Sequence, residues 1–270
     1  MAGRLGALDD RLRRAPEGWR HRLALIEAAD LSWITGDRIA PDRLALWVAL
    51  RLSGVQDDTA ALARVGWAVR RLTGGPGPEG DLPAFLDRRE GEPLAFRAAG
   101  WLELMAAGRT LHPITRAALG FHLWPLAGLG PGLEAAVTAA RIAAGEGGGA
   151  VFAPVAMGGA VALRATGTPE ARLSRWLEGM ETAILTAMRH LDDTEAWAAR
   201  AEAPMRTLSG KTPPALRAAF AEWPLISAPM AETLTGASRA AVQRNLIWMQ
   251  THGLIREVTG QGRYRMWKAV

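Results

Sequence analysis

Residues 227–268 decide the fold of the C-terminal part of the chain and read SAPMAETLTGASRAAVQRNLIWMQTHGLIREVTGQGRYRMWK. Ser227 and Ser238 are of the type that caps helix N-termini, because a serine oxygen can accept a free N–H of the first turn. Gly236 lies between them and can adopt the left-handed conformation that ends a helix. The stretch therefore predicts a short helix, a glycine-containing turn and a second helix over residues 239–252.

Both helices of this pair have apolar residues that we expect to face a common core. Val242, Leu246 and Met249 are spaced i, i+4 and i+7, which places them on one buried stripe of the second helix. In the first helix, Met230 and Leu234 are expected to point inward. The polar residues of the second helix then lie on its opposite, outward face.

A third helix precedes the pair and a β-hairpin follows it. The third helix is expected to begin at Thr212, which can cap it, and to end at Pro224. Two strands, 254–258 and 263–267, are joined by the turn Thr259-Gly260-Gln261-Gly262. This order of elements predicts a winged helix-turn-helix with a two-stranded wing, in which Trp267 packs between the wing and the helices, as does Tyr264.

Positive charge is concentrated in this same region. Residues 211–270 contain eight basic and three acidic side chains, so their excess of five equals the net charge of the whole chain, +5. Residues 1–210 are electrically balanced. A basic module on a neutral body favours a polyanion partner, and we expect that partner to be double-stranded DNA. A solvated basic surface is the alternative explanation.

We expect helix 239–252 to enter the major groove and the 254–268 wing to contact phosphates. Long polar donors near the start of that helix suit the edges of guanine and adenine. The candidate DNA-binding residues are Ser227, Ser238, Arg239, Gln243, Arg244, Arg256, Gln261, Arg263, Arg265 and Lys268.

The sequence predicts two domains, a helical domain over 1–208 and the winged helix-turn-helix over 209–270. Helical spacing of apolar residues recurs through the first domain, whose expected role is dimerisation or sensing. Thr168-Pro169 predicts the start of a long helix that runs to about Arg206. Residues 151–163 are apolar and rich in glycine and proline, which indicates a buried extended segment or a loop.

Several classes of function find no support in the sequence. The chain has no cysteine, which excludes disulfides, thiolate metal sites and a cysteine nucleophile. It has no secretory signal and no apolar run of membrane-spanning length, so we expect a cytoplasmic protein without a membrane partner. No metal-binding, phosphate-binding or nucleophile motif is present, and we expect neither a cofactor nor a metal, nor an enzyme. A homodimer remains open, since DNA readers of this type often pair.

The stretches 224–230 and 259–267 resemble a bacterial, largely alphaproteobacterial family of uncharacterised proteins that join a helical domain of unknown function to a C-terminal helix-turn-helix. In that family the wing reads close to Thr-Gly-Arg-Gly-Arg-Tyr-Arg-Ala-Trp. Here Gln261 replaces the first arginine and Met266 replaces the alanine. The resemblance implies a DNA-binding regulator and carries no reaction with it.

Two alternatives stay open at this stage. The winged module also looks like the C-terminal appendage of some Fic-type AMP transferases, which would make residues 1–208 a degenerate enzyme. The one His-Pro pair, His112-Pro113, lacks the acidic residue, asparagine and glycines of the Fic motif. The other alternative is a protein-interaction adaptor that uses the winged helix for docking.

Overall fold

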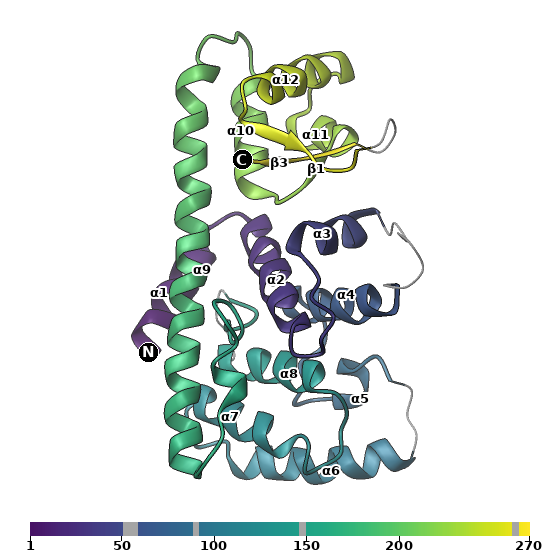
Figure 1. Cartoon of the computed structure of the whole chain (residues 1–270), viewed down its shortest axis with the longest axis vertical. Helices are drawn as coiled ribbons and strands as arrows, with labels where there is room; N and C mark the ends of the chain where they lie inside the picture. The colour runs from purple at the N-terminus through teal and green to yellow at the C-terminus, as the bar shows by residue number, and fades with distance from the viewer. Residues whose placement is uncertain (51–58, 89–91, 146–149, 261–264) are drawn as a thin grey trace. The chain divides into compact units, whose positions relative to one another are not determined.

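The computed structural model describes residues 1–50, 59–88, 92–145, 150–260 and 265–270. Within these ranges the chain is mainly helical, as the sequence predicts, with a small antiparallel sheet near the C-terminus (Figure 1). No helix of the described residues is long and apolar enough to cross a membrane. The helices are α1 (Ala2–Arg14), α2 (Glu17–Ser32), α3 (Pro41–Leu50), α4 (Thr59–Thr73), α5 (Leu82–Phe85), α6 (Glu92–Ala107), α7 (Pro113–Leu123), α8 (Gly132–Ala144), α9 (Pro169–Met205), α10 (Thr212–Glu222), α11 (Ala228–Thr235) and α12 (Arg239–Thr251). The strands are β1 (Ile226–Ser227), β2 (Ile255–Glu257) and β3 (Met266–Ala269).

The chain divides into two compact units. The first unit comprises Met1–Ala15 and Leu23–Met188, and the second comprises Pro16–Arg22 and Arg189–Val270. Helices α2 and α9 each contribute residues to both units. The predicted domain 209–270 lies wholly within the second unit, which also takes in the last part of α9.

In the first unit, residues 152–157 are buried and irregular, as the sequence indicates for 151–163, whereas Gly158, Gly159 and Val161 are exposed and Ala162–Arg164 form a 3-10 helix. Glu27 of α2 holds this segment in place. Its fully buried carboxylate accepts the backbone N–H groups of Val155, Ala156 and Met157 at 2.8, 2.9 and 3.1 Å. These three bonds satisfy consecutive donors that have no partner in a helix or strand.

The second unit has one hydrophobic core, to which every one of its helices from α9 onward contributes. Its fully buried members include Ala201, Leu216, Phe220, Ile226, Ala231, Val242, Leu246 and Met249. Trp197 of α9 belongs to the same core, and its indole Nε1 donates to the carbonyl of Leu254 at 2.8 Å. The end of α9 is thus built into the C-terminal unit through both packing and a hydrogen bond.

Residues 16–22 join the second unit by covering the C-terminal end of α10. The last carbonyls of a helix have no partner within it. Trp19 Nε1 donates to the carbonyl of Ala221 at 3.1 Å, and a terminal nitrogen of Arg22 donates to the carbonyl of Phe220 at 3.1 Å. Burial lowers the pKa of Arg22 to about 10. This segment therefore supplies side-chain partners for carbonyls that α10 leaves open.

The sheet has the strand order β1-β3-β2, with both pairings antiparallel. The predicted strands are corrected in two ways. The hairpin strands are Ile255–Glu257 and Met266–Ala269, so the second continues two residues past its predicted end, while its predicted start at 263 lies outside the described residues. The sequence also does not predict β1, because two residues are too few to display alternation. β1 forms through its long-range pairing with β3, in which Ser227 lies opposite Met266.

Candidate nucleic-acid interface

Helices α11 and α12 are separated by a turn whose predicted caps are confirmed. The Ser227 hydroxyl oxygen accepts the N–H of Met230 at 3.3 Å. Gly236 has φ of +63° and closes α11 in the left-handed conformation. Ser238 caps α12, and its hydroxyl oxygen accepts the N–H of Ala241 at 3.4 Å. The local sequence signals therefore fix where both helices begin and where the first one ends.

The inward face of α12 is as predicted, and that of α11 is so in part, since Met230 packs against the core as expected. Val242, Leu246 and Met249 are fully buried in the core of the second unit. Leu234, which the sequence places inward, is 43% exposed. The inward position of α11 belongs to Ala231, which is fully buried. An eight-residue helix presents little surface to its neighbours, and in α11 a small side chain occupies the contact.

The outward face of α12 consists of Arg239, Ala240, Gln243, Arg244 and Ile247, which are all exposed. These residues follow i, i+3 and i+4 spacing, so their side chains emerge from one side of the helix. The structure therefore brings together three of the predicted contact residues. Ile247, 59% exposed, is absent from the predicted set, although its position four residues after Gln243 signals the same face.

The exposed arginines of α12 and β2 are not held in ion pairs. Among the described residues, Arg239, Arg244 and Arg256 have no ion-pair partner. Arg217 differs, because its guanidinium lies 2.6 Å from the carboxylate of Glu202 on α9. The charge of Arg217 is used within the fold, whereas the guanidinium groups of Arg239, Arg244 and Arg256 are left for solvent or a ligand.

The basic side chains of the β2–β3 hairpin lie in different surroundings. Arg256 on β2 lies opposite Lys268 on β3, so both side chains belong to one face of the sheet. The guanidinium of Arg265 lies 5.0 Å from the ring centroid of Trp267, which is buried as predicted. Arg265 is thus partly engaged inside the unit. The predicted residues that fall outside the described residues are Gln261, Arg263 and Tyr264.

Glu257 stabilises the start of the hairpin turn. Its carboxylate accepts the N–H of Thr259 at 2.7 Å, the Thr259 hydroxyl and the N–H of Gly260 at 3.2 Å. Burial raises the pKa of Glu257, but these hydrogen bonds and the charge of Arg265 outweigh it, so the net direction is downward. The one acidic residue on the strands of the hairpin therefore stays ionised and shapes the turn.

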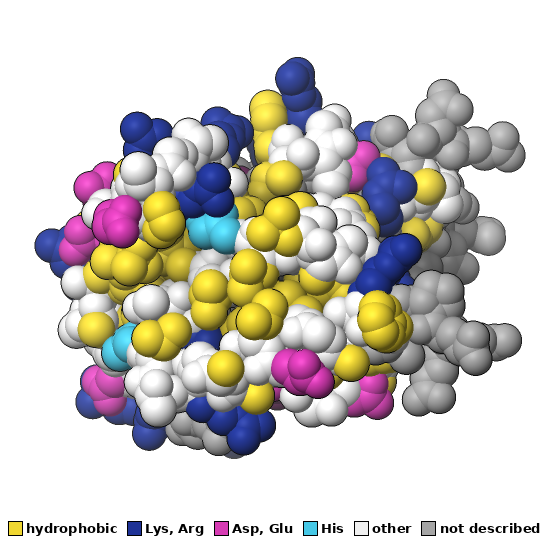
Figure 2. Space-filling view, turned by 90° about the horizontal axis from the view of Figure 1, so that it is seen from below, with side chains coloured by type: hydrophobic (Ala, Val, Ile, Leu, Met, Phe, Trp, Pro, Cys, Tyr) yellow, Lys and Arg dark blue, Asp and Glu magenta, His cyan; other side chains and the backbone are white. Residues whose placement is uncertain are grey.

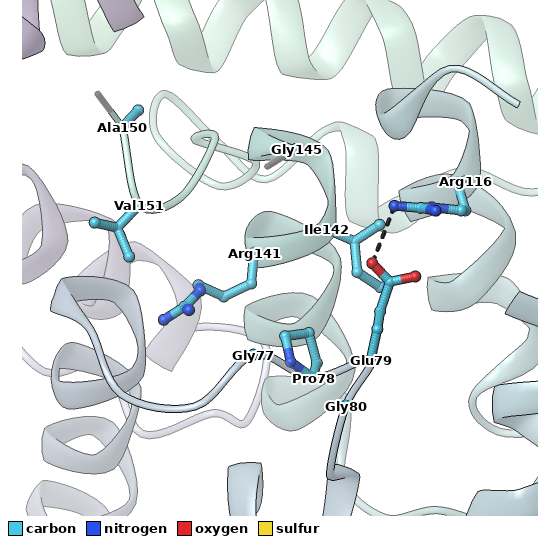
Figure 3. A pocket seen from close by; sticks show the side chains of 10 residues that line it. All are labelled: Gly77, Pro78, Glu79, Gly80, Arg116, Arg141, Ile142, Gly145, Ala150 and Val151. Atoms are coloured by element: carbon cyan, nitrogen blue, oxygen red, sulfur yellow. Dashed lines mark hydrogen bonds and ion pairs between the residues drawn. The ribbon is translucent and has the colours of Figure 1, made fainter. Parts of the chain in front are cut away.

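A pocket in the first unit with charged lining residues is the candidate active site under the enzymatic alternative. It has a volume of about 330 Å³, and its charged lining residues are Glu79, Arg116 and Arg141 (Figure 3). Arg116 is ion-paired to Glu79 at 3.0 Å. Arg141 donates to the carbonyl of Gly74 at 2.8 Å. These groups hold the fold together, and among the described residues no cluster of three or more histidines and carboxylates could hold a metal ion.

The His112-Pro113 pair also has a structural role. His112 is the N-cap of α7, and its Nδ1 accepts the N–H of Ile114 at 3.3 Å. Pro113 occupies the first helical position, where no N–H is needed. The pair therefore serves to start a helix.

Comparisons with known proteins assign neither a family nor a function to the chain. No family model matches the chain, and a search of curated proteins found no match.

Proposed function

We propose that the second unit is a winged helix-turn-helix that binds double-stranded DNA, and that the chain is a transcriptional regulator. The observation that carries this proposal is the outward face of α12. It offers a glutamine and two arginines without an ion-pair partner among the described residues, while three fully buried side chains anchor the opposite face of the same helix. The element order α10-β1-α11-α12-β2-β3 is compatible with such a fold.

The dimensions and chemistry of α12 suit the major groove. A helix of thirteen residues is about 20 Å long, and the groove, about 12 Å wide, admits one helix. Arginine pairs with the O6 and N7 atoms of guanine, and glutamine with the N6 and N7 atoms of adenine. Ile247 extends the same stripe and is suited to contact a thymine methyl group.

The two capping serines suit phosphate contacts. Each hydroxyl oxygen accepts a backbone N–H within its helix, which leaves the hydroxyl proton free to donate. Ser227 and Ser238 stand at helix N-termini, where the backbone favours an anion. Arg256 and Lys268 on the hairpin supply further positive charge. The resemblance of residues 224–230 and 259–267 to the bacterial helix-turn-helix family agrees with this proposal.

Fluorescence anisotropy with labelled duplexes of about three helical turns tests the proposal on the full chain. Replacing Arg239→Ala together with Arg244→Ala should weaken binding at least tenfold, since each specific contact is worth about 1–3 kcal/mol. The control pair, Lys211→Ala with Arg175→Ala, removes the same charge from exposed positions outside α12. Equal weakening by both pairs would refute the assigned helix.

Protein docking is the second candidate function, and the exposed apolar residues Leu234 and Ile247 favour it. The two candidates differ in their dependence on salt. Phosphate contacts make DNA affinity fall steeply as the salt concentration rises. The affinity of a protein interface centred on two apolar side chains would change little with the salt concentration.

A further inference from the structure

An apolar groove of about 330 Å³ lies in the first unit, between α7 and the first turns of α9. Half of its lining residues are leucines, namely Leu111, Leu119, Leu123, Leu126 and Leu173. Leu111 and Leu126 are 41% and 82% exposed, which is unusual for leucines grouped around one groove. Seen from the side that carries the start of α9, Figure 2 shows hydrophobic side chains gathered on this face of the unit, with histidine and basic side chains among them.

Three polar side chains interrupt the apolar lining. Nε2 of His122 is inaccessible to solvent and has no hydrogen-bond partner among the described residues. Burial lowers the pKa of His122, with a smaller contribution from Arg172, so the ring is neutral near pH 7. A neutral imidazole has one N–H donor and one acceptor nitrogen. The hydroxyl of Thr115 lies in the same lining.

Arg172 is the one charged residue in the described lining of the groove. Its Nε donates to the carbonyl of Gly167 at 2.9 Å, which fixes the direction of the side chain. Its two terminal nitrogens have no partner among the described residues. The groove therefore combines a long apolar wall with one positioned cation.

We propose that this groove binds a small amphipathic carboxylate, with its apolar chain against the leucines and its carboxylate on Arg172. The volume lies within the usual range for ligand sites, about 300–1,000 Å³. The carboxylate can accept from the terminal nitrogens of Arg172. A purely apolar ligand gains nothing from the guanidinium of Arg172, and a cationic ligand is repelled by it. This inference goes beyond the proposed function, since it concerns the first unit whether or not the second unit binds DNA.

Calorimetric titration of the full chain with sodium octanoate tests the proposal, with 1-octanol as the uncharged probe. Octanoate should bind more tightly than octanol. Replacing Arg172→Gln should weaken octanoate binding about tenfold, which corresponds to the loss of one charge-assisted hydrogen bond, and leave octanol binding unchanged. The control Arg175→Gln alters an exposed arginine of the same helix that does not line the groove, and should leave both affinities unchanged.

Several results would overturn the proposal. They are the absence of octanoate binding to the native chain, equal affinity for octanoate and octanol, and equal weakening by Arg172→Gln and Arg175→Gln. Sedimentation velocity tests whether a second copy of the chain occupies the groove, because such binding would produce a dimer. A dimer that Leu126→Glu dissociates and that octanoate does not affect would assign the groove to self-association instead.

Discussion

The buried carboxylate of Glu27 should make the stability of the chain depend on pH in a distinctive direction. Burial raises the pKa of Glu27 from 4.5 to about 7, with a further contribution from Asp30, against the lowering effect of its three backbone hydrogen bonds. The folded chain then holds a proton that the unfolded chain has released. Stability contributed by this group is present below pH 4.5 and is lost as the pH rises through 7.

The magnitude follows from the size of that pKa change. Each pKa unit corresponds to about 1.4 kcal/mol, so the rise from 4.5 to about 7 amounts to about 3 kcal/mol. Replacing Glu27→Gln removes the titration, because an amide stays neutral. The variant also places an NH₂ group near the N–H of Met157, or another of the three donors, which costs about 1–3 kcal/mol at every pH.

Urea unfolding followed by tryptophan fluorescence, at several pH values between 4.5 and 8, measures the effect. The native chain should exceed E27Q in stability at low pH, and this difference should shrink by about 3 kcal/mol on going to pH 8. Burial also lowers the pKa values of His21 and His122, but these groups titrate in both proteins and cancel in the difference. Glu178→Gln, which removes one carboxylate from an exposed position of α9, is the matched control. A difference between native chain and E27Q that does not change with pH would refute the reasoning.

Two further substitutions test the contacts of the second unit by thermal and urea unfolding. Gly18→Ala should lower the free energy of unfolding by about 1–3 kcal/mol, because a Cβ at this position would lie 2.6 Å from Cγ of Glu222. The control is Gly6→Ala in α1, where a Cβ meets no atom within 4 Å, so this substitution should stabilise the chain slightly. Equal effects of the two alanines would contradict the close packing of residue 18. Trp197→Phe should cost about 1 kcal/mol or more, since the carbonyl of Leu254 loses its indole donor, and an unchanged unfolding midpoint would show that this bond contributes nothing.

Features of the second unit that depend on local sequence could be predicted. Ser227, Gly236 and Ser238 act within one helical turn of their own positions, so their capping roles follow from residue type and spacing. The buried stripe of α12 follows in the same way from helical periodicity. The same periodicity predicts the exposure of Ile247, because the side of the helix opposite a buried stripe faces outward.

Features that depend on distant partners could not be predicted. β1 is a strand only because Ser227 meets Met266 across the sheet. The contacts of Trp19 with the end of α10 join residues about two hundred positions apart, and no periodicity in residues 16–22 signals them. Residue type alone predicts an inward Leu234, but the fully buried side chain of α11 is that of Ala231. The carboxylate of Glu27 likewise gains its role from a segment far along the chain.

The most direct test of the proposed DNA interface uses the absence of cysteine from the chain. Gln243→Cys introduces a single thiol on the outward face of α12, and its rate of alkylation by iodoacetamide can be measured with and without saturating duplex DNA. Glu178→Cys provides an equally unique thiol at an exposed position of α9. The proposal predicts that DNA slows alkylation at position 243 several-fold and leaves position 178 unchanged. Unchanged alkylation at position 243 under conditions where the duplex is bound would contradict it.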